Sequence, residues 1–383
     1  MKNILITFGR SFLALEMARH WHAAGHRVFI ADSVRYHVSK YSNAVVKTFK
    51  VPSPRFHQTE YIQGLLHIVQ EEKIDLLIPI YEEISWISKA LPRFPSSCHV
   101  FSPSFELYQQ LQNKWLFQEM LHQLGFAPLK SRLIRTQKDL DHHDFNTPFA
   151  LKPCYSRASH NVQKIEPGQI PPQIAIDPNN PWIAQEWATG KKFCTYSICR
   201  QGNITAQGIY PVHYAINGNS CVTFEAVEHP EIAQWIESLV ARLQFTGQIA
   251  FDFIETDHKL FAIECNPRAT SGLLLFNDSP GIPEAVLGNS HSLLRPETGT
   301  RRQIAMGMLL YGWKKNAKPN NNLKDFVSDF FGIKDVVFSS KDPKPFLYEP
   351  WIFSYIWTKS RQLELTIPEF FTHDHDWNGQ PLS

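Results

Sequence analysis

The sequence lacks the features that define several classes of protein. No apolar run approaches the roughly 20 residues of a membrane span, and the run at residues 4–8 ends at Gly9, too early for a secretory leader. The six cysteines include no CxxC pair, as expected of reduced thiols in a cytosolic protein. Because 38 Lys and Arg nearly balance 36 Asp and Glu, the chain has no basic footprint for nucleic acid. We therefore expect a cytoplasmic protein that binds neither membranes nor nucleic acids.

What the sequence does contain indicates a multidomain globular protein. It has 383 residues, of which 43% are hydrophobic and 19% charged. This proportion of apolar residues can form cores, and the low charge content is unlike that of disordered segments. At roughly 100–200 residues per domain, the length predicts two or three domains.

The first hundred residues alternate between patterns typical of strands and of helices. In chain order these are a strand at 4–8, a helix from 13 to 21, a strand at 28–31, a helix at 59–72 and a strand at 75–79. The alternation predicts a parallel sheet with right-handed crossovers, an α/β fold. The turn at Gly9 and Ser11 offers backbone N–H groups to an anion. It lacks GxGxxG spacing, so NAD is not expected.

The rest of the chain has a different pattern. The sequence predicts a helix over 104–124, a proline-closed strand at 148–153, a proline-rich loop at 165–181, strands at 182–187, 193–200, 203–209 and 220–227, and a helix over 230–243. These strands favour antiparallel sheets, an α+β arrangement. Beyond about residue 295 we expect irregular chain.

One predicted hairpin carries most of the chemistry. Two apolar runs, 247–255 and 260–266, flank a polar turn centred on His258. That centre places Asp252 opposite Glu264, and period-two alternation puts Asn266 on the Glu264 face. Opposed carboxylates repel unless a cation lies between them, and carboxylate and amide oxygens suit Mg²⁺. A solvent-facing polar side of the hairpin is the alternative.

These residues resemble a known family. Glu264-Cys-Asn-Pro-Arg268, with Asp252 upstream, looks like the metal hairpin of the ATP-grasp superfamily, in particular of carbamoyl-phosphate synthetase large chains and related carboxylate–amine ligases. The resemblance implies that Asp252, Glu264 and Asn266 hold the Mg²⁺ that bridges ATP phosphates. It also implies that Arg268 is catalytic, facing the transferred phosphoryl group or the substrate.

The resemblance extends upstream and implies a domain division. Lys114 resembles the family's helix-borne lysine, and Lys152 resembles the strand lysine that reaches the phosphates and acts in catalysis. Gln185, Glu186 and Trp187 resemble the hinge that holds adenine. The implied fold is a Rossmann-like pre-ATP-grasp domain at 1–103, an ATP-grasp domain of two α+β subdomains at 104–300, and a C-terminal extension of unknown role at 301–383.

One segment departs from the family. The flap after the phosphate lysine is usually glycine-rich, whereas residues 154–161 contain no glycine. Arg157 in this flap is expected to stabilise charge directly as a further catalytic residue. The same departure is also what a catalytically weakened protein would show.

The function that follows is an ATP-dependent ligase, with ATP and Mg²⁺ as cofactors. It would activate a carboxylate as an acyl phosphate for attack by an amine or another nucleophile. The alternatives are a weakened ATP-binding protein that acts by interaction, and a small-molecule kinase on the same scaffold. The expected partners are small-molecule carboxylate and amine substrates, and a homodimer stays open.

Three other motifs each allow two interpretations. Glu82-Glu83 follow a predicted strand, as either a substrate contact or an acidic helix N-terminus. His213-Tyr214 are expected to make local hydrogen bonds, with an acceptor pocket as the alternative. The HDHD run at 373–376 is interpreted as a polar tail in preference to a metal site.

Overall fold

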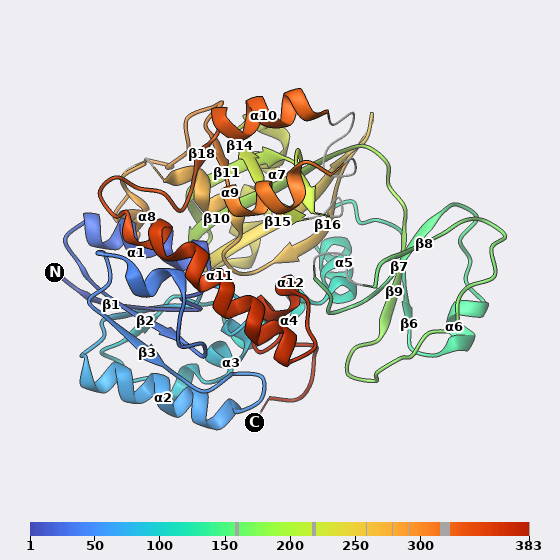
Figure 1. Ribbon diagram of the computed structural model, residues 1–383. Coiled ribbons are helices and arrows are strands. Elements are labelled where there is room, and N and C mark those ends of the chain that lie inside the picture. Colours follow the sequence, from blue (N-terminus) through green and yellow to red (C-terminus); the bar gives the residue numbers. More distant parts are fainter. Residues whose placement is uncertain are drawn as a thin grey trace.

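The computed structural model describes residues 1–157, 161–216, 220–257, 259–277, 279–290, 292–314 and 322–382. Its elements follow the predicted order, an α/β part and then an α+β part (Figure 1). Among the described helices, none is both long enough and apolar enough to cross a membrane.

The N-terminal part is built on a parallel sheet, as predicted. Its strands are β1 (Asn3–Thr7), β2 (Arg27–Asp32), β3 (Lys47–Lys50), β4 (Leu76–Ile78) and β5 (His99–Val100), in the order β3-β2-β1-β4-β5. Its helices are α1 (Phe12–Ala23), α2 (Gln58–Glu71) and α3 (Ile84–Lys89), with the short turns η1 (Val38–Tyr41) and η2 (Leu91–Arg93). Ile4 and Ile6 pack into the core that contains α1 residues, and Leu5 packs into the core that contains α2 residues. Strand periodicity thus gives each face of the sheet its own helical layer.

Two antiparallel sheets form the next part of the chain. The smaller contains β6 (Ser131–Ile134), β9 (Trp182–Glu186), β7 (Phe149–Pro153) and β8 (Gln163–Ile165), and α6 (Gln137–Asp141) lies beside it. The larger contains β11 (Asn203–Pro211), β10 (Lys191–Arg200), β15 (Gly247–Glu255) and β16 (Leu260–Asn266). Helix α7 (Pro230–Leu243) buries its apolar side against the larger sheet. Figure 1 shows the smaller sheet projecting from the molecule beyond α5, while the larger one lies near its centre.

The predicted helix over 104–124 is wrong as a single helix. It is two helices, α4 (Phe105–Gln112) and α5 (Lys114–Gln123), separated by Asn113 in an extended conformation. The Asn113 side-chain oxygen accepts hydrogen bonds from Trp115 N at 3.0 Å and Leu116 N at 3.1 Å. Asparagine is a strong N-cap, so the break starts a new helix directly at Lys114.

The expectation of irregular chain beyond residue 295 is also wrong. After η3 (Ser271–Phe276) and α8 (Ile282–Leu287), the chain forms several further elements. They are β17 (Arg301–Gln303), α9 (Ala305–Gly307), the helical turn η4 (Met308–Gly312), α10 (Leu323–Gly332), β18 (Lys334–Asp335), α11 (Lys344–Gln362) and α12 (Ile367–Thr372). β17 and β18 join β14 (Thr223–Glu225) in a small sheet, and β12 (Ala215–Ile216) pairs with β13 (Ser220–Cys221). Pro350 lies inside α11, where a proline normally indicates a break.

Helix α11 packs across the N-terminal part (Figure 1). Tyr348 stacks on Tyr41 with ring centres 4.2 Å apart, and Trp351 meets Tyr36 edge-on at 4.5 Å. Aromatic pairs of this kind stabilise beyond their buried area. Helix α11 is therefore packed on the N-terminal part of the chain.

The turn after β1 is satisfied within the protein. A Cβ on Gly9 would lie 2.3 Å from Ile30 and 2.8 Å from the His37 ring, so only glycine fits. The Arg10 backbone N–H donates to the Asp32 carboxylate at 2.7 Å. At this turn, the anion is therefore a side chain of the chain itself.

His37 gives the fold a pH dependence. Burial lowers its pKa from 6.5 to about 4, although Asp32 alone would raise it; Arg10 and Lys40 lower it further. Between these two pH values the unfolded chain binds a proton at His37 and the folded chain does not. The free energy of unfolding is therefore highest above the unfolded pKa of His37 and decreases as the pH falls toward 4. We expect His37 to reduce the free energy of unfolding by about 2 kcal/mol between about pH 7 and about pH 5. Urea titrations of wild type and His37→Asn test this: equal pH slopes would exclude His37 as the cause.

Candidate functional site

Two carboxylates face each other across the β15–β16 hairpin. Asp252 and Glu264 are direct partners in the register, as predicted, and Ala250 pairs with Asn266. The side chains of Asp252 and Asn266 are both hydrogen-bonded to Glu264. The Glu264 side chain is 24% exposed, so the set is not a solvent-facing surface. His258, the expected centre of the turn, lies outside the described residues.

The pKa values of the two carboxylates are shifted in opposite directions. Burial, the Cys194 thiol and Glu264 raise the pKa of Asp252 well above its usual range. Burial would also raise the pKa of Glu264, but Lys114, the hydrogen bond with Asp252 and Lys152 lower it overall to about 2. Asp252 is therefore the protonated member and Glu264 the charged one, which is how two close carboxylates avoid repulsion.

Both predicted phosphate lysines reach this pair. Lys114, at the start of α5, has its Nζ 3.4 Å from Glu264 Oε2 and donates to Ser156 O at 2.6 Å. Lys152, on β7, is close enough to both carboxylates for them to raise its pKa. Its pKa is nevertheless lowered to about 8, by burial and by Lys114. Two nearly buried lysines beside paired carboxylates have the chemistry that suits a phosphorylated ligand with a cation.

The donor set fits Mg²⁺. Asp252, Glu264 and Asn266 supply hard oxygen ligands, and a cation between the two opposed carboxylates would neutralise them. Within the described residues no group of three or more His, Cys, Asp or Glu is placed to hold a metal. Two carboxylates and one amide are few ligands, which suits an ion that keeps waters and binds substrate phosphates.

The predicted hinge residues end β9. Gln185 is 2% exposed and pairs with Ser131 of β6 and Ala150 of β7. The backbone N–H of Glu186 donates to Lys130 O at 2.8 Å, and that of Trp187 to Pro148 O at 2.9 Å. Because both N–H groups are used within the sheet, an adenine ring would have to meet other groups of this hinge.

Arg268 connects the hairpin to the N-terminal sheet. Its Nη2 donates to Asn266 Oδ1 at 3.1 Å. Its guanidinium lies 4.5 Å from the centre of the Tyr81 ring, and its Nε is 3.9 Å from Glu82 Oε1. The arginine therefore lies beside the candidate metal residues, at the boundary between two parts of the chain.

Arg157 has different partners from the lysines. Its Nε donates to Glu82 Oε1 at 2.8 Å and lies 3.2 Å from Asp376 Oδ1, and its Nη1 donates to Asn378 Oδ1 at 2.7 Å. These contacts direct the guanidinium toward the N-terminal sheet and the C-terminus. The expected flap continues into Ala158, Ser159 and His160, which lie outside the described residues.

Glu82 and Glu83 are both fully buried. Glu83 accepts from Thr7 Oγ1 at 2.5 Å and from Ile80 N at 2.9 Å, contacts that hold the loop after β4. Glu82 binds Arg157 and accepts from Gln112 Nε2 at 3.0 Å. Burial raises the Glu82 pKa but Arg157 outweighs it, so the pKa is lowered overall and the carboxylate stays charged.

The interpretation of 373–376 as a polar tail is wrong. Asp374 is 6% exposed and His375 is 1% exposed. Asp374 Oδ1 lies 2.9 Å from Arg10 Nη1, and the His375 ring packs on Phe8.

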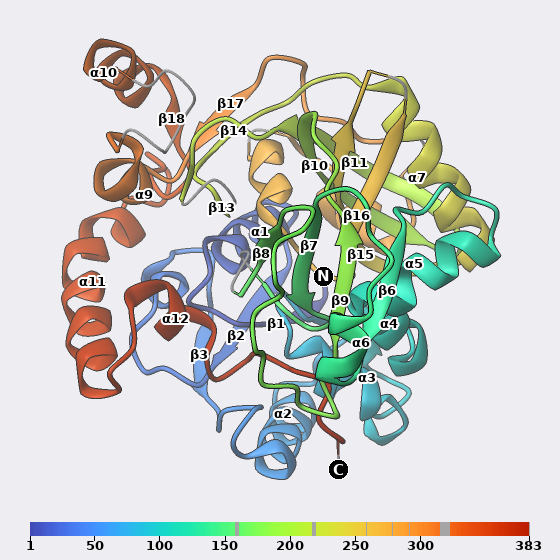
Figure 2. The ribbon, with the colours of Figure 1, turned by 90° about the vertical axis from the view of Figure 1, so that its right-hand side faces the viewer.

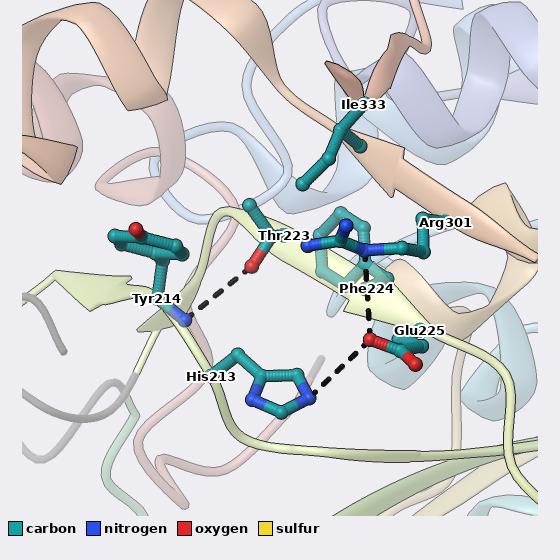
Figure 3. A pocket seen from close by; sticks show the side chains of 7 residues that line it. All are labelled: His213, Tyr214, Thr223, Phe224, Glu225, Arg301 and Ile333. Carbon is teal, nitrogen blue, oxygen red and sulfur yellow. Dashed lines mark hydrogen bonds and ion pairs between the residues drawn. The ribbon is translucent and has the colours of Figure 1, made fainter. Parts of the chain in front are cut away.

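His213 and Tyr214 line a pocket of about 320 Å³ (Figure 3). Glu225 lies between two basic side chains, with Oε2 3.6 Å from His213 Nε2 and 3.5 Å from Arg301 Nε. The Tyr214 hydroxyl donates to Asp329 Oδ2 at 3.0 Å. The two side chains therefore line a pocket, and its use as an acceptor pocket stays a prediction.

Sequence reasoning did not find two functional candidates here, Asp376 and Trp377. Trp377 is 2% exposed and its backbone N–H donates to Glu82 Oε2 at 3.1 Å. Their signal was weak: an acidic residue followed by a tryptophan in a polar C-terminal stretch.

Comparisons with known proteins agree with this geometry. Residues 111–272 match the family profile of the ATP-grasp domain. The chain is 18% identical over 253 residues to a carbamoyl phosphate synthase large chain from Clostridium acetobutylicum. That alignment covers 61% of this chain and 24% of the relative, so the chain spans about a quarter of the relative's length.

Solved structures agree on the fold. N5-carboxyaminoimidazole synthetase from Staphylococcus aureus, in complex with ADP, has a TM-score of 0.62 at 14% identity, covering 78% of this chain and 80% of that one. The L-amino acid ligase from Bacillus licheniformis has a TM-score of 0.54 at 14% identity, covering 71% and 68%. The resemblance predicted from the hairpin is confirmed: residues 111–272 match the ATP-grasp domain, and the solved structures share the fold.

Proposed function

We propose that this protein is an ATP-dependent ligase that joins a carboxylate to an amine or a similar nucleophile. The observation that carries the proposal is the in-register pair Asp252 and Glu264 with Asn266 beside it, facing Lys114 and Lys152. The similarity to a carbamoyl phosphate synthase and to an L-amino acid ligase supports it.

The reaction would proceed in two steps. A carboxylate oxygen forms a bond to the γ-phosphorus of ATP while the bond from that phosphorus to the ADP oxygen breaks. The amine then attacks the acyl carbon and loses a proton, and inorganic phosphate leaves. This chemistry asks the protein mainly for position and charge.

Each group of residues would bind a different part of the substrates. Asp252, Glu264 and Asn266 would hold Mg²⁺, which when bound neutralises phosphate charge. Lys114 and Lys152 would bind the phosphates, since both are nearly buried and close to the hairpin carboxylates. Gln185, Glu186 and Trp187 would border adenine, and Arg268, beside Asn266, would face the carboxylate.

A second candidate is a weakened ATP-binding protein that acts by interaction. The contacts of Arg157 favour it, since this flap residue pairs with Glu82 and Asp376. Such a protein would be stabilised by Mg²⁺-ATP without releasing ADP.

The test is a screen of carboxylates and amines coupled to ADP release, with mass spectrometry of the products. We expect ADP release that depends on one carboxylate and one amine, with a condensed product in equal amount. A stable phosphorylated product would instead indicate a kinase, and thermal stabilisation by Mg²⁺-ATP without ADP release would favour the second candidate.

A further inference from the structure

The last residues of the chain return over the carboxyl ends of the N-terminal strands. We call residues 373–382 the strap. The centre of the His375 ring lies 4.8 Å from that of Phe8, which follows β1. The backbone N–H of Trp377 donates at 3.1 Å to Glu82, which follows β4. Figure 2 shows this segment running from α12 along the N-terminal part to the C-terminus. In open α/β sheets, ligands bind outside this edge, so the strap covers a place where a substrate is expected.

Asp376 of the strap is held as a bound carboxylate would be. Its Oδ1 lies 3.2 Å from Arg157 Nε and accepts from the Tyr81 hydroxyl at 3.2 Å. Its Oδ2 accepts from Thr372 Oγ1 at 3.2 Å. Apart from Thr372, these donors belong to the flap and to the N-terminal loop, and a guanidinium is the usual partner of a carboxylate.

Two arginines share one carboxylate, Glu82, at this place. Arg157 and Arg268 both face Glu82, one in a hydrogen-bonded pair and the other at 3.9 Å. Without the strap, two positive groups would meet one negative group, an excess of one positive charge. Asp376 supplies the missing negative charge. The Nε of Arg268 also has no hydrogen-bond partner among the described residues, so this arginine keeps a donor for a ligand.

The position also suits the proposed reaction. Arg268 donates to Asn266 on the hairpin and stacks over Tyr81, whose hydroxyl binds Asp376. One chain of contacts thus joins the candidate metal residues to the Asp376 carboxylate. In this chain, Tyr81 and Arg268 are the two side chains between an acceptor carboxylate and Asn266 of the hairpin.

We propose that Arg157, Tyr81 and Arg268 form the binding site for the substrate carboxylate, and that Asp376 occupies it as an internal substitute. The inference rests on the proposed function for the identity of the ligand. Its consequence is that the strap withdraws before a carboxylate binds, so the chain restrains its own activity.

Asp374, two residues earlier in the strap, is the natural control. It pairs with Arg10, which also pairs with Asp32 at 2.6 Å. Without Asp374, Arg10 keeps the Asp32 carboxylate 2.6 Å away, so its guanidinium stays paired. A free carboxylate is expected to replace Asp376 and not Asp374.

The test is rescue by acetate in the full-length chain. Thermal unfolding of wild type, Asp376→Ala and Asp374→Ala is measured in sodium acetate and in sodium chloride of equal ionic strength. We expect acetate to raise the Tm of Asp376→Ala by about 3 °C relative to chloride, and to leave the other two unchanged. Arg157→Met combined with Asp376→Ala should remove the effect. If Asp376→Ala does not fold, Asp376→Asn, which keeps the size of the side chain, takes its place.

The outcomes separate this inference from the proposed function. The carboxylate site is overturned if acetate raises the Tm of Asp376→Ala no more than chloride does, or if it raises the Tm of Asp374→Ala equally. ADP release with Mg²⁺-ATP and acetate is then compared in wild type and Asp376→Ala, and we expect it to be about tenfold faster in the variant. If acetate raises the Tm of Asp376→Ala but no variant releases ADP, the carboxylate site is supported and the ligase is contradicted. If ADP release depends on a carboxylate but acetate does not raise the Tm, the ligase is supported and the carboxylate site is contradicted.

Discussion

Glu264→Gln is expected to reduce Mg²⁺-ATP turnover by a factor of about 1,000 while the protein stays folded. Glu264 is the charged member of the hairpin pair, with its pKa lowered to about 2, and Lys114 lies 3.4 Å from it. The amide keeps the shape of the side chain but removes the charge that would attract a divalent cation and orient the lysine. ADP release with the substrates found in the screen measures the effect.

The matched control for this variant is Asp257→Asn. Asp257 lies in the turn of the same hairpin and is exposed, so its amide variant changes charge without reaching the site. We expect wild-type turnover from it. Equal losses of turnover in the two variants, or wild-type turnover from Glu264→Gln, would contradict a role for the hairpin carboxylates in turnover.

Arg10→Met is expected to lower the free energy of unfolding by about 3–5 kcal/mol. Arg10 is 3% exposed and lies between Asp32, 2.6 Å away, and Asp374, 2.9 Å away. Burial acts to lower its pKa, yet the two carboxylates raise it overall, so the guanidinium is charged. Methionine would leave two buried carboxylates facing each other without a cation. Denaturant unfolding of the variant measures the loss.

Two further variants separate this network from a general effect of losing an arginine. Arg93 is exposed on the surface, and Arg93→Met should change stability by less than about 0.5 kcal/mol. Adding Asp374→Asn to Arg10→Met removes one of the unpaired charges, so the double variant should be more stable than Arg10→Met alone. A double variant that is less stable would mean that Asp374 acts through contacts other than Arg10.

The parts of the site that the sequence predicted depend on local periodicity. Asp252 and Glu264 are 12 residues apart in one hairpin, and they pair as predicted, although through a register shift between Asp252 and Phe253 that the alternation does not indicate. The parallel order of β1, β2 and β4 likewise follows from alternating strand and helix patterns. In both cases the interacting residues are near each other in the chain.

The parts that were missed depend on contacts between distant segments. Arg10 and Asp374 are separated by 364 residues, and no local pattern indicates that a polar C-terminal run will bury its carboxylates there. Helix α11, which contains Pro350, forms in a part of the chain where irregular structure was expected, and it packs on Tyr36 and Tyr41 of the N-terminal part. Tertiary contacts decide such cases.

The most direct test of the central claim follows one oxygen atom. The carboxylate found in the screen is labelled with oxygen-18 and incubated with the protein, Mg²⁺-ATP and the amine. If the carboxylate attacks the γ-phosphorus, one labelled oxygen leaves in inorganic phosphate for each condensed product. We predict this transfer in full. Inorganic phosphate without label, alongside condensed product, would contradict an acyl phosphate and with it the account of the site.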